Sequence, residues 1–348
     1  MYATKIPTTQ TAARVHNPGP EARFVIQNGQ PVPQLTENQV LVKLLVAGLC
    51  HSDLNRVYGT LPLISDIVGH EGVGIVVQAG SAATSKMINK RVGLGWLSRP
   101  CMKCEVCDVE YTSCPKQQNL GRDLDGTFQQ YIAVDADFVH PLPDKLESEI
   151  AAPLLCAGIS MYSAIKKCNL QSGNWVLIPG AGGGLGHLGV QVAKSQGYRV
   201  IAVDTGDEKR RICLEFGAAH FIDYLTEDVL AEIGRLTCIG VHGVICSAGS
   251  VAAYQQAAQC VRNAGTIVCI GVNPQNLPIS PLDMVRRGLR LVGSAVGTRS
   301  EMQELFQLAA RGEMKPLITV VPFEKFDIMA KKLEKGQVKG RIVMEMPQ

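Results

Sequence analysis

The sequence has little net charge, no long apolar run and no cluster of basic residues. Its 34 Lys and Arg residues nearly balance its 31 Asp and Glu residues, which leaves a formal net charge of +3. Without a run of Lys and Arg, so small a charge argues against the basic patch of a nucleic-acid binding protein. No uninterrupted apolar stretch approaches the roughly 20 residues that a membrane helix needs. We therefore expect neither nucleic acid nor a membrane as a partner.

The N-terminus lacks the apolar core of a secretion signal, because Met1–Lys5 lead directly into Pro and Thr. This predicts an unexported, cytoplasmic protein. The alternative is a mitochondrial presequence, because Lys5 and Arg14 are basic and no acidic residue precedes Glu21. In the cytoplasm a cysteine cluster favours metal over disulfides. Four of the twelve cysteines fall close together, at Cys101, Cys104, Cys107 and Cys114. Four thiolates around one ion make a closed, structural zinc site; the alternative is four thiols without a ligand.

The 348 residues are too many for one ordinary core, so two domains are expected. The opening part alternates apolar and polar residues, and residues 39–46 are typical of a strand that runs directly toward Cys50. Residues 67–77 and 91–97 indicate further strands. This part is predicted to be a β-rich, partly closed barrel.

After Asn174 the pattern changes to strand, glycine-rich turn, helix and strand. The strands are residues 175–179 and 199–204, and the turn between the first strand and the helix contains Gly180, Ala181, Gly182, Gly183, Gly184, Leu185 and Gly186. Such glycines let backbone N–H groups and a helix N-terminus approach a pyrophosphate. Asp204 ends the second strand, where a carboxylate accepts hydrogen bonds from ribose hydroxyls and repels a 2′-phosphate. The pattern predicts NAD rather than NADP.

Four more apolar strands follow, at residues 219–223, 243–247, 266–272 and 289–295, separated by helical patterns. Alternating strands and helices predict a doubly wound, six-stranded parallel sheet of the Rossmann type; the alternative is an unrelated α/β domain. A helix is expected at residues 300–311, with strands at 318–321 and 340–345. The predicted domains are a catalytic domain over 1–156, with a cysteine lobe at about 97–116, a nucleotide domain over 157–296, and a return to the first domain over 297–348.

The segment Gly69–Gly74 contains His70 and Glu71. Its functional interpretation depends on two cysteines that are distant in the sequence, Cys50 and Cys156. One imidazole and two thiolates suit zinc, and three protein ligands leave a fourth position open for a substrate. Taken alone, His70 could as well be a buried histidine beside a glycine-rich turn.

Several motifs between about Gln39 and Arg341 resemble the zinc-containing medium-chain alcohol dehydrogenases, and within them the fungal, yeast-type branch. The matching pieces are Cys50–Leu54, Gly69–Gly74, the four-cysteine lobe, Phe128–Tyr131, Leu155–Ser160, the glycine turn, Glu334–Gln337 and Gly340–Arg341. The resemblance implies an α/β protein with a GroES-like catalytic domain and a Rossmann domain. It also implies two zinc ions per chain and NAD as cofactors.

The resemblance implies roles for the matching residues. Cys50, His70 and Cys156 would bind the catalytic zinc, with Glu71 able to replace a ligand transiently. Asp53 would orient His70, and Ser52 would pass the proton of the alcohol. The implied cofactor contacts, besides the glycine turn and Asp204, are His51 and Arg341 at the pyrophosphate, Lys209 at the adenosine ribose, and Val272 and Val296.

The chain departs from the yeast-type pattern at three positions around the substrate. Asn55 replaces the histidine at the outer end of the proton relay, so protons are expected to exchange through water or the cofactor ribose. Leu61 replaces a bulky Trp and Val272 replaces a Met, while Trp96 remains. Ser52, Leu61, Trp96 and Val272 would then line a roomier, more apolar pocket than ethanol requires. The cysteine lobe is also one residue shorter than usual between Cys107 and Cys114, which a surface loop tolerates.

Three functions remain open at this stage. The first is a zinc- and NAD-dependent alcohol dehydrogenase or aldehyde reductase, with a primary alcohol or aldehyde substrate larger than ethanol. The second is a reductase of an activated C=C or C=N bond in specialised metabolism, which the change at Asn55 motivates. The third is a non-catalytic NAD-binding protein, because fold alone does not establish activity. Relatives form dimers or tetramers, so a homo-oligomer is expected, with residues 291–296 as a possible pairing strand.

Overall fold

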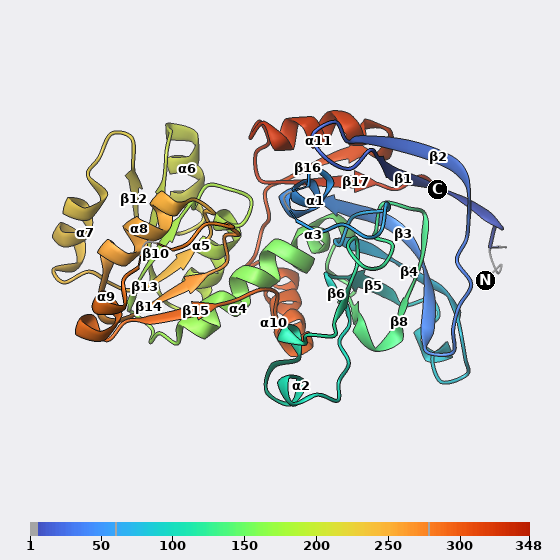
Figure 1. Ribbon diagram of the computed structural model, residues 1–348, viewed down its shortest axis with the longest axis horizontal. Coiled ribbons are helices and arrows are strands. Elements are labelled where there is room, and N and C mark those ends of the chain that lie inside the picture. The colour runs from blue at the N-terminus through green and yellow to red at the C-terminus, as the bar shows by residue number, and fades with distance from the viewer. Residues whose placement is uncertain (1–5, 60, 278) are drawn as a thin grey trace. The chain divides into compact units, whose positions relative to one another are not determined.

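The computed structural model describes residues 6–59, 61–277 and 279–348 (Figure 1). The chain forms two compact units. The first contains the chain through Cys156 together with Thr298–Ala310 and Ile318–Gln348, and the second contains Ala157–Gly297 and Arg311–Leu317. The five N-terminal residues, on which the prediction about export depends, lie outside the described part of the chain.

The first unit is built on a seven-stranded sheet, which confirms the predicted β-rich domain. The strand order is β16-β17-β3-β4-β5-β9, and β8 pairs with β3. All neighbours are antiparallel except β16 and β17. The strands are β3 (Gln39–Leu49), β4 (Gly72–Ala79), β5 (Arg91–Leu94), β8 (Tyr131–Asp135), β9 (Val139–Pro141), β16 (Ile318–Pro322) and β17 (Arg341–Glu345). Pairing of β3 with β4 brings Ala47 opposite Gly72, so the two segments that carry Cys50 and His70 start side by side.

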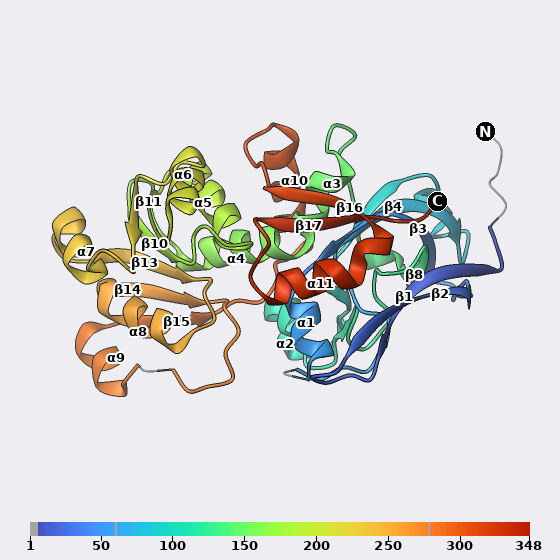
Figure 2. The ribbon, with the colours of Figure 1, turned by 90° about the horizontal axis from the view of Figure 1, so that it is seen from above.

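Shorter elements surround this sheet. They are the ribbons β1 (Thr9–His16) with β2 (Arg23–Pro31) and β6 (Leu97–Arg99) with β7 (Gln118–Asn119), and the helices α1 (His51–Val57), α2 (Glu105–Glu110), α3 (Ser148–Pro153), α10 (Arg299–Ala310) and α11 (Phe326–Glu334). Helix α11 packs against α1 and β2 (Figure 2). Its Phe326 ring is 4.5 Å from the ring centroids of both Phe24 and Phe128, so it joins the C-terminal part of the unit to the N-terminal ribbon.

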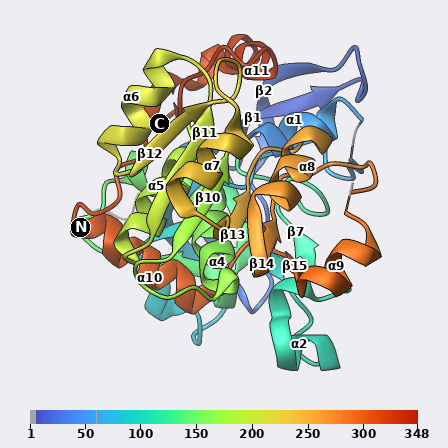
Figure 3. The same cartoon turned by 90° about the vertical axis from the view of Figure 1, so that its left-hand side faces the viewer.

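The second unit contains the predicted six-stranded parallel sheet, in the order β12-β11-β10-β13-β14-β15. Its strands are β10 (Trp175–Pro179), β11 (Arg199–Asp204), β12 (His220–Asp223), β13 (Val241–Cys246), β14 (Val261–Cys269) and β15 (Arg290–Gly293). Its helices form two groups, and the helices within each group contact one another (Figure 3). One group is α4 (Ile159–Cys168), α5 (Gly186–Ser195) and α6 (Asp207–Glu215), and the other is α7 (Val229–Thr237) and α8 (Val251–Cys260). Helix α9 (Pro281–Arg287) packs on β14. Burial of β10, β11 and β13 explains the continuous apolar runs of these strands.

The second unit also contains a segment that the sequence analysis assigned to the first unit. Residues 311–317, with Gly297, belong to the nucleotide unit rather than to the predicted return over 297–348. The reason is a pair of polar side chains on α5. Gln191 donates to the Lys315 carbonyl at 3.2 Å and accepts from the Lys315 N–H at 2.7 Å, and the Leu317 N–H lies 3.1 Å from Nε2 of His187.

One helical stretch, Ser148–Cys168, has the length and composition of a membrane span. Its most apolar window is 78% buried inside the protein. That burial is the environment of a core helix, because neighbouring elements already cover the apolar side chains.

Replacing Phe326 with Ala should destabilise the first unit by about 3–5 kcal/mol, because the substitution leaves a cavity between Phe24 and Phe128. Urea unfolding followed by the fluorescence of Trp96, in a Trp175→Phe background, measures this change. Ile328→Ala on the exposed side of the same helix is the matched control and should change the free energy of unfolding by less than about 0.5 kcal/mol. Equal losses in the two variants would contradict the role given to Phe326.

Candidate metal and nucleotide sites

Asp53 connects the two segments that carry the metal-ligand candidates of the first unit. Cys50 directly follows β3 and is the N-cap of α1, and its N–H donates to Oδ2 of Asp53 at 3.0 Å. The other oxygen, Oδ1, lies 2.8 Å from Nδ1 of His70. A hydrogen bond at Nδ1 fixes the orientation of the ring and leaves Nε2 for a metal. The predicted positioning role of Asp53 agrees with this geometry.

Three donor atoms converge at this point. Sγ of Cys156, in the π-helical turn Leu154–Gly158, lies 3.9 Å from Sγ of Cys50 and 3.2 Å from Nε2 of His70. Together with a carboxylate oxygen of Glu71, all these atoms lie within 4.8 Å of one another. Zinc with bonds of about 2.0–2.3 Å would separate such ligand atoms by about 3.5–3.8 Å. The donor set therefore fits a zinc ion.

The electrostatics of the donors favour a positive charge among them. Hydrogen bonding between the two thiols lowers the pKa of Cys50 well below its usual value and raises the pKa of Cys156. Burial lowers the pKa of His70, but the Asp53 carboxylate and the Cys50 thiol outweigh it and raise the pKa to about 10. The protein atoms thus stabilise a cation here, and a dication would supply that charge.

Glu71 forms a buried ion pair with Arg341. Its other oxygen, Oε2, is buried and has no hydrogen-bond partner, and only a glycine at position 48 leaves room for it. Burial raises the pKa of Glu71 and the Arg341 guanidinium opposes that shift. The unpaired oxygen is consistent with the prediction that Glu71 replaces a metal ligand transiently.

The two residues predicted to bind pyrophosphate differ in exposure. Arg341 is 5% exposed and forms an ion pair with Glu71, whereas His51 is exposed at the start of α1.

Ser52 and Trp96 lie beside the metal-ligand candidates. The Ser52 hydroxyl donates to Sγ of Cys50 at 3.0 Å and lies 3.4 Å from Nε2 of His70. The Trp96 ring meets the His70 ring edge-on, with centroids 5.5 Å apart. Asn55 and Leu61 are partly buried, and the Leu61 N–H donates to the Asn55 carbonyl at 3.0 Å.

The structure adds two arginines that the sequence analysis missed. Arg56 places its guanidinium 4.2 Å from the centroid of the Trp96 ring, and Arg122 lies 5.6 Å from the same centroid. The sequence feature that could have identified Arg56 is its position four residues after Ser52, which places both side chains on the same face of a helix. The surroundings of Trp96 are therefore less apolar than predicted.

The four lobe cysteines come together around α2. Their sulfurs lie 3.5 Å apart for Cys104 and Cys107, 3.6 Å for Cys101 and Cys114, and 3.9 Å for Cys101 and Cys107. These separations match the edges of about 3.8 Å expected around a tetrahedral zinc ion. The backbone hydrogen bond from Lys103 lowers the pKa of Cys101 to about 6, which favours the thiolate that a metal binds. The shortened loop leaves all four sulfurs in position.

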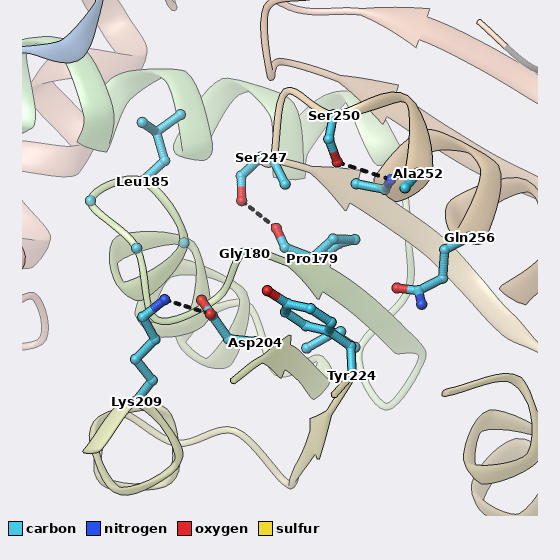
Figure 4. Close-up of a pocket in the computed structure, with 16 residues that line it drawn as sticks. Pro179, Gly180, Leu185, Asp204, Lys209, Tyr224, Ser247, Ser250, Ala252 and Gln256 are labelled. Carbon is cyan, nitrogen blue, oxygen red and sulfur yellow. Dashed lines mark hydrogen bonds and ion pairs between the residues drawn. The ribbon is translucent and has the colours of Figure 1, made fainter. Parts of the chain in front are cut away.

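In the second unit, the glycine turn and the end of β11 line a cavity of about 460 Å³ (Figure 4). Asp204 accepts hydrogen bonds from the Gly182 N–H at 2.8 Å and the Thr205 N–H at 2.9 Å, and the ammonium of Lys209 lies 2.6 Å from its Oδ1. A Cβ at position 186 would lie 2.2 Å from the Gly180 carbonyl oxygen, so the close approach of turn and helix requires glycine. The cavity fits the adenosine and phosphate parts of a dinucleotide.

The other predicted cofactor contacts are distributed over the second unit. Val272 is 63% exposed and Val296 is partly exposed, and neither lines the cavity beside Asp204. Tyr224, which the sequence analysis missed, does line it and projects an exposed ring beside Asp204 (Figure 4). The sequence feature that could have identified Tyr224 is its position directly after β12, at the same sheet edge as Asp204.

Comparison with known proteins identifies the family. Residues 36–144 match the alcohol dehydrogenase GroES-like domain, and residues 184–311 match the zinc-binding dehydrogenase family. The alcohol dehydrogenase of Geobacillus stearothermophilus is 40% identical over 318 residues, which cover 90% of this chain and 93% of that protein. The alcohol dehydrogenase of Schizosaccharomyces pombe is 37% identical over 347 residues, covering 98% and 99%. The solved acetophenone reductase of Geotrichum candidum in complex with NAD has a TM-score of 0.88 and 28% identity, over 98% of each chain. The chain is therefore an oxidoreductase of the zinc-containing medium-chain alcohol dehydrogenase family.

Proposed function

We propose that the protein is a zinc- and NAD-dependent alcohol dehydrogenase or aldehyde reductase, of the fungal branch of the family. The observation that carries this proposal is the convergence of Cys50, His70 and Cys156 with the Ser52 hydroxyl beside them. Three such ligands leave one position around zinc for a substrate oxygen. The lobe cysteines would hold a second, structural zinc ion.

The chain's own residues would orient the substrate and move a proton. When bound, zinc would polarise the substrate oxygen, and the nicotinamide would exchange the hydride. The Ser52 hydroxyl, 3.0 Å from a candidate ligand, is placed to exchange a proton with an oxygen held there. Asn55 cannot titrate near neutral pH, so we infer that the proton continues through water or the cofactor ribose.

We propose NAD as the cofactor because of the charge at Asp204. Its carboxylate lies at the cavity wall, where it would accept hydrogen bonds from both ribose hydroxyls and repel a 2′-phosphate. The solved neighbour bound to NAD supports this choice. Lys209, paired with Asp204, would contact the same ribose.

We propose a primary alcohol or aldehyde larger than ethanol as the substrate. Leu61 has less volume than the Trp of the yeast-type pattern, and an added methylene in an apolar site is worth about 1–3 kcal/mol. A structural neighbour whose name states that it reduces acetophenone, a bulky aromatic ketone, supports a roomy site in this fold.

We also propose a cytoplasmic homodimer or homotetramer. Strand β15 is the last strand of its sheet and its side chains are largely exposed, with Leu291 40% exposed. An uncovered edge strand is a natural place for pairing with a second copy.

Metal content tests the two proposed zinc sites. The native protein should contain two zinc ions per chain, and Cys156→Ser should contain one, with activity reduced on the order of 10³-fold because the Lewis acid is lost. Mass spectrometry under native conditions measures the stoichiometry. Cys238→Ser, at an exposed cysteine outside both groups, is the control and should keep both ions. Retention of two ions by Cys156→Ser would refute the assignment.

A series of aldehydes tests the substrate size. Specificity constants with NADH should rise from acetaldehyde to aromatic aldehydes, and Leu61→Trp should lower the value for the aromatic aldehydes by about tenfold or more. Ile64→Trp, at a 74% exposed position, is the matched control. The highest values for acetaldehyde would contradict the size prediction. Saturated carbonyl products from enals would favour the reductase of activated C=C bonds instead.

Asp204→Asn tests the cofactor choice. Removing the charge should lower the specificity constant for NADH by about 10- to 100-fold, because charge-assisted hydrogen bonds to the ribose are lost. It should raise the value for NADPH, since Lys209 is released to meet the 2′-phosphate. Initial rates with both cofactors measure the ratio, and Asp207→Asn, an exposed carboxylate in the first turn of α6, is the control. An unchanged ratio would show that Asp204 does not select the cofactor.

A further inference from the structure

Arg56 is a buried cation held beside the metal-ligand candidates. It is 9% exposed and projects from α1, four residues after Ser52, so the two side chains share one face of the helix. One of its terminal nitrogens, Nη1, donates to the Ser52 carbonyl at 2.8 Å. The guanidinium is therefore anchored to the residue that would exchange the proton.

Within the described residues, Arg56 has no carboxylate partner. The Ser52 carbonyl is the one hydrogen-bond acceptor found for it there, and its Nε is buried with no acceptor. The nearby Asp53 uses its oxygens for the Cys50 N–H and the His70 ring. Burial lowers the pKa of Arg56 and the Asp53 charge opposes this, but a guanidinium stays charged in proteins. A buried charge without a hydrogen-bonded counter-ion is costly, so an anion would relieve that cost.

The Trp96 ring connects this cation to the metal-ligand candidates. Arg56 lies 4.2 Å from the centroid of the Trp96 ring, and His70 meets the same ring edge-on at 5.5 Å. Both Cys50 and Cys156 interact electrostatically with Arg56. Both groups therefore contact one indole ring, and a molecule held at His70 and extending along that ring would approach the guanidinium.

Arg122 approaches the same ring but differs in its charge balance. It lies 5.6 Å from the Trp96 centroid and forms an ion pair with Asp123 at 2.7 Å. Its charge is thus already neutralised. One cation without an ion-pair partner matches one carboxylate, whereas a phosphate monoester carries a charge of about −1.5 to −2 at neutral pH.

We propose that Arg56 binds a carboxylate of the substrate, so that the natural substrate is an aldehyde or alcohol that carries a carboxylate away from the reacting carbon. This inference rests on the proposed function, because the reacting oxygen is taken to lie at the Cys50, His70 and Cys156 group. The carboxylate takes no part in the reaction: the aldehyde gains a hydride from NADH and a proton, and yields the alcohol and NAD⁺. Arg56 thus determines specificity and orients the substrate by a planar, charge-assisted contact.

A matched pair of aldehydes tests the proposal. The native protein should reduce 4-formylbenzoate with a specificity constant about 10- to 100-fold above that for its methyl ester, as expected for a charge-assisted hydrogen bond. Arg56→Gln should remove this preference by lowering the value for the acid while the ester changes by less than about threefold. Arg122→Gln is the matched control and should keep the preference, because that arginine is already paired.

Several outcomes would overturn the proposal. No preference for the acid in the native protein, or an equal loss for acid and ester in Arg56→Gln, would mean that Arg56 only supports Trp96 or balances the thiol charges. A clear preference for 4-formylphenyl phosphate over the carboxylate would refute the charge argument.

A binding measurement separates failure of this proposal from failure of the proposed function. Trp175→Phe leaves Trp96 as the single tryptophan, so benzoate bound at Arg56 should change its fluorescence in a saturable way. The apparent dissociation constant of benzoate should rise at least tenfold after Arg56→Gln. Binding without reduction of any aldehyde would refute the proposed function alone. Absence of a saturable change, with neutral aldehydes still reduced, would refute the role of Arg56 alone.

Discussion

The geometry of the first unit depends on the carboxylate of Asp53. One oxygen accepts the N–H of Cys50 and so caps helix α1, while the other holds the ring of His70. Because α1 begins at this cap, the same contact sets the direction of the Ser52 hydroxyl and of Arg56. A single buried side chain thus relates a sulfur donor, a nitrogen donor, a hydroxyl and a cation. Helix α1 is short, so its own hydrogen bonds alone would not hold it in place.

The sequence predicted the parts whose signal is local. The spacing of Cys101 and its three partners, and the strand, glycine turn and helix after Asn174, each specify a structure within a few dozen residues. The approach of Cys50, His70 and Cys156 is different, because it depends on the pairing of β3 with β4 and on a π-helical turn far along the chain. The residue types alone suggested this group but left a buried histidine as the alternative, and the resemblance to a family decided between the two. Their roles in catalysis remain proposals.

Features that depend on tertiary contacts were missed or misplaced. Arg56 has the sequence pattern of a solvated helix residue, but it is buried and its guanidinium lies over the ring of Trp96, forty positions later. Residues 311–317 follow a predicted helix with no boundary signal, and two side chains of α5 draw them into the second unit. In each case a distant partner outweighs the local pattern.

Two buried arginines of the first unit, Arg56 and Arg341, differ in how their charge is balanced. Arg341 meets the carboxylate of Glu71, so its charge is compensated inside the protein. Arg56 meets a backbone carbonyl and an aromatic face, which are weaker partners for a full charge than a carboxylate. A cation kept at that cost beside Ser52 is better explained by a ligand than by stability, because an apolar residue of similar size would stabilise the fold as well. If the metal-ligand group holds one end of a substrate and Arg56 the other, both points are set by one short helix, so the orientation of the substrate follows from the cap that Asp53 provides.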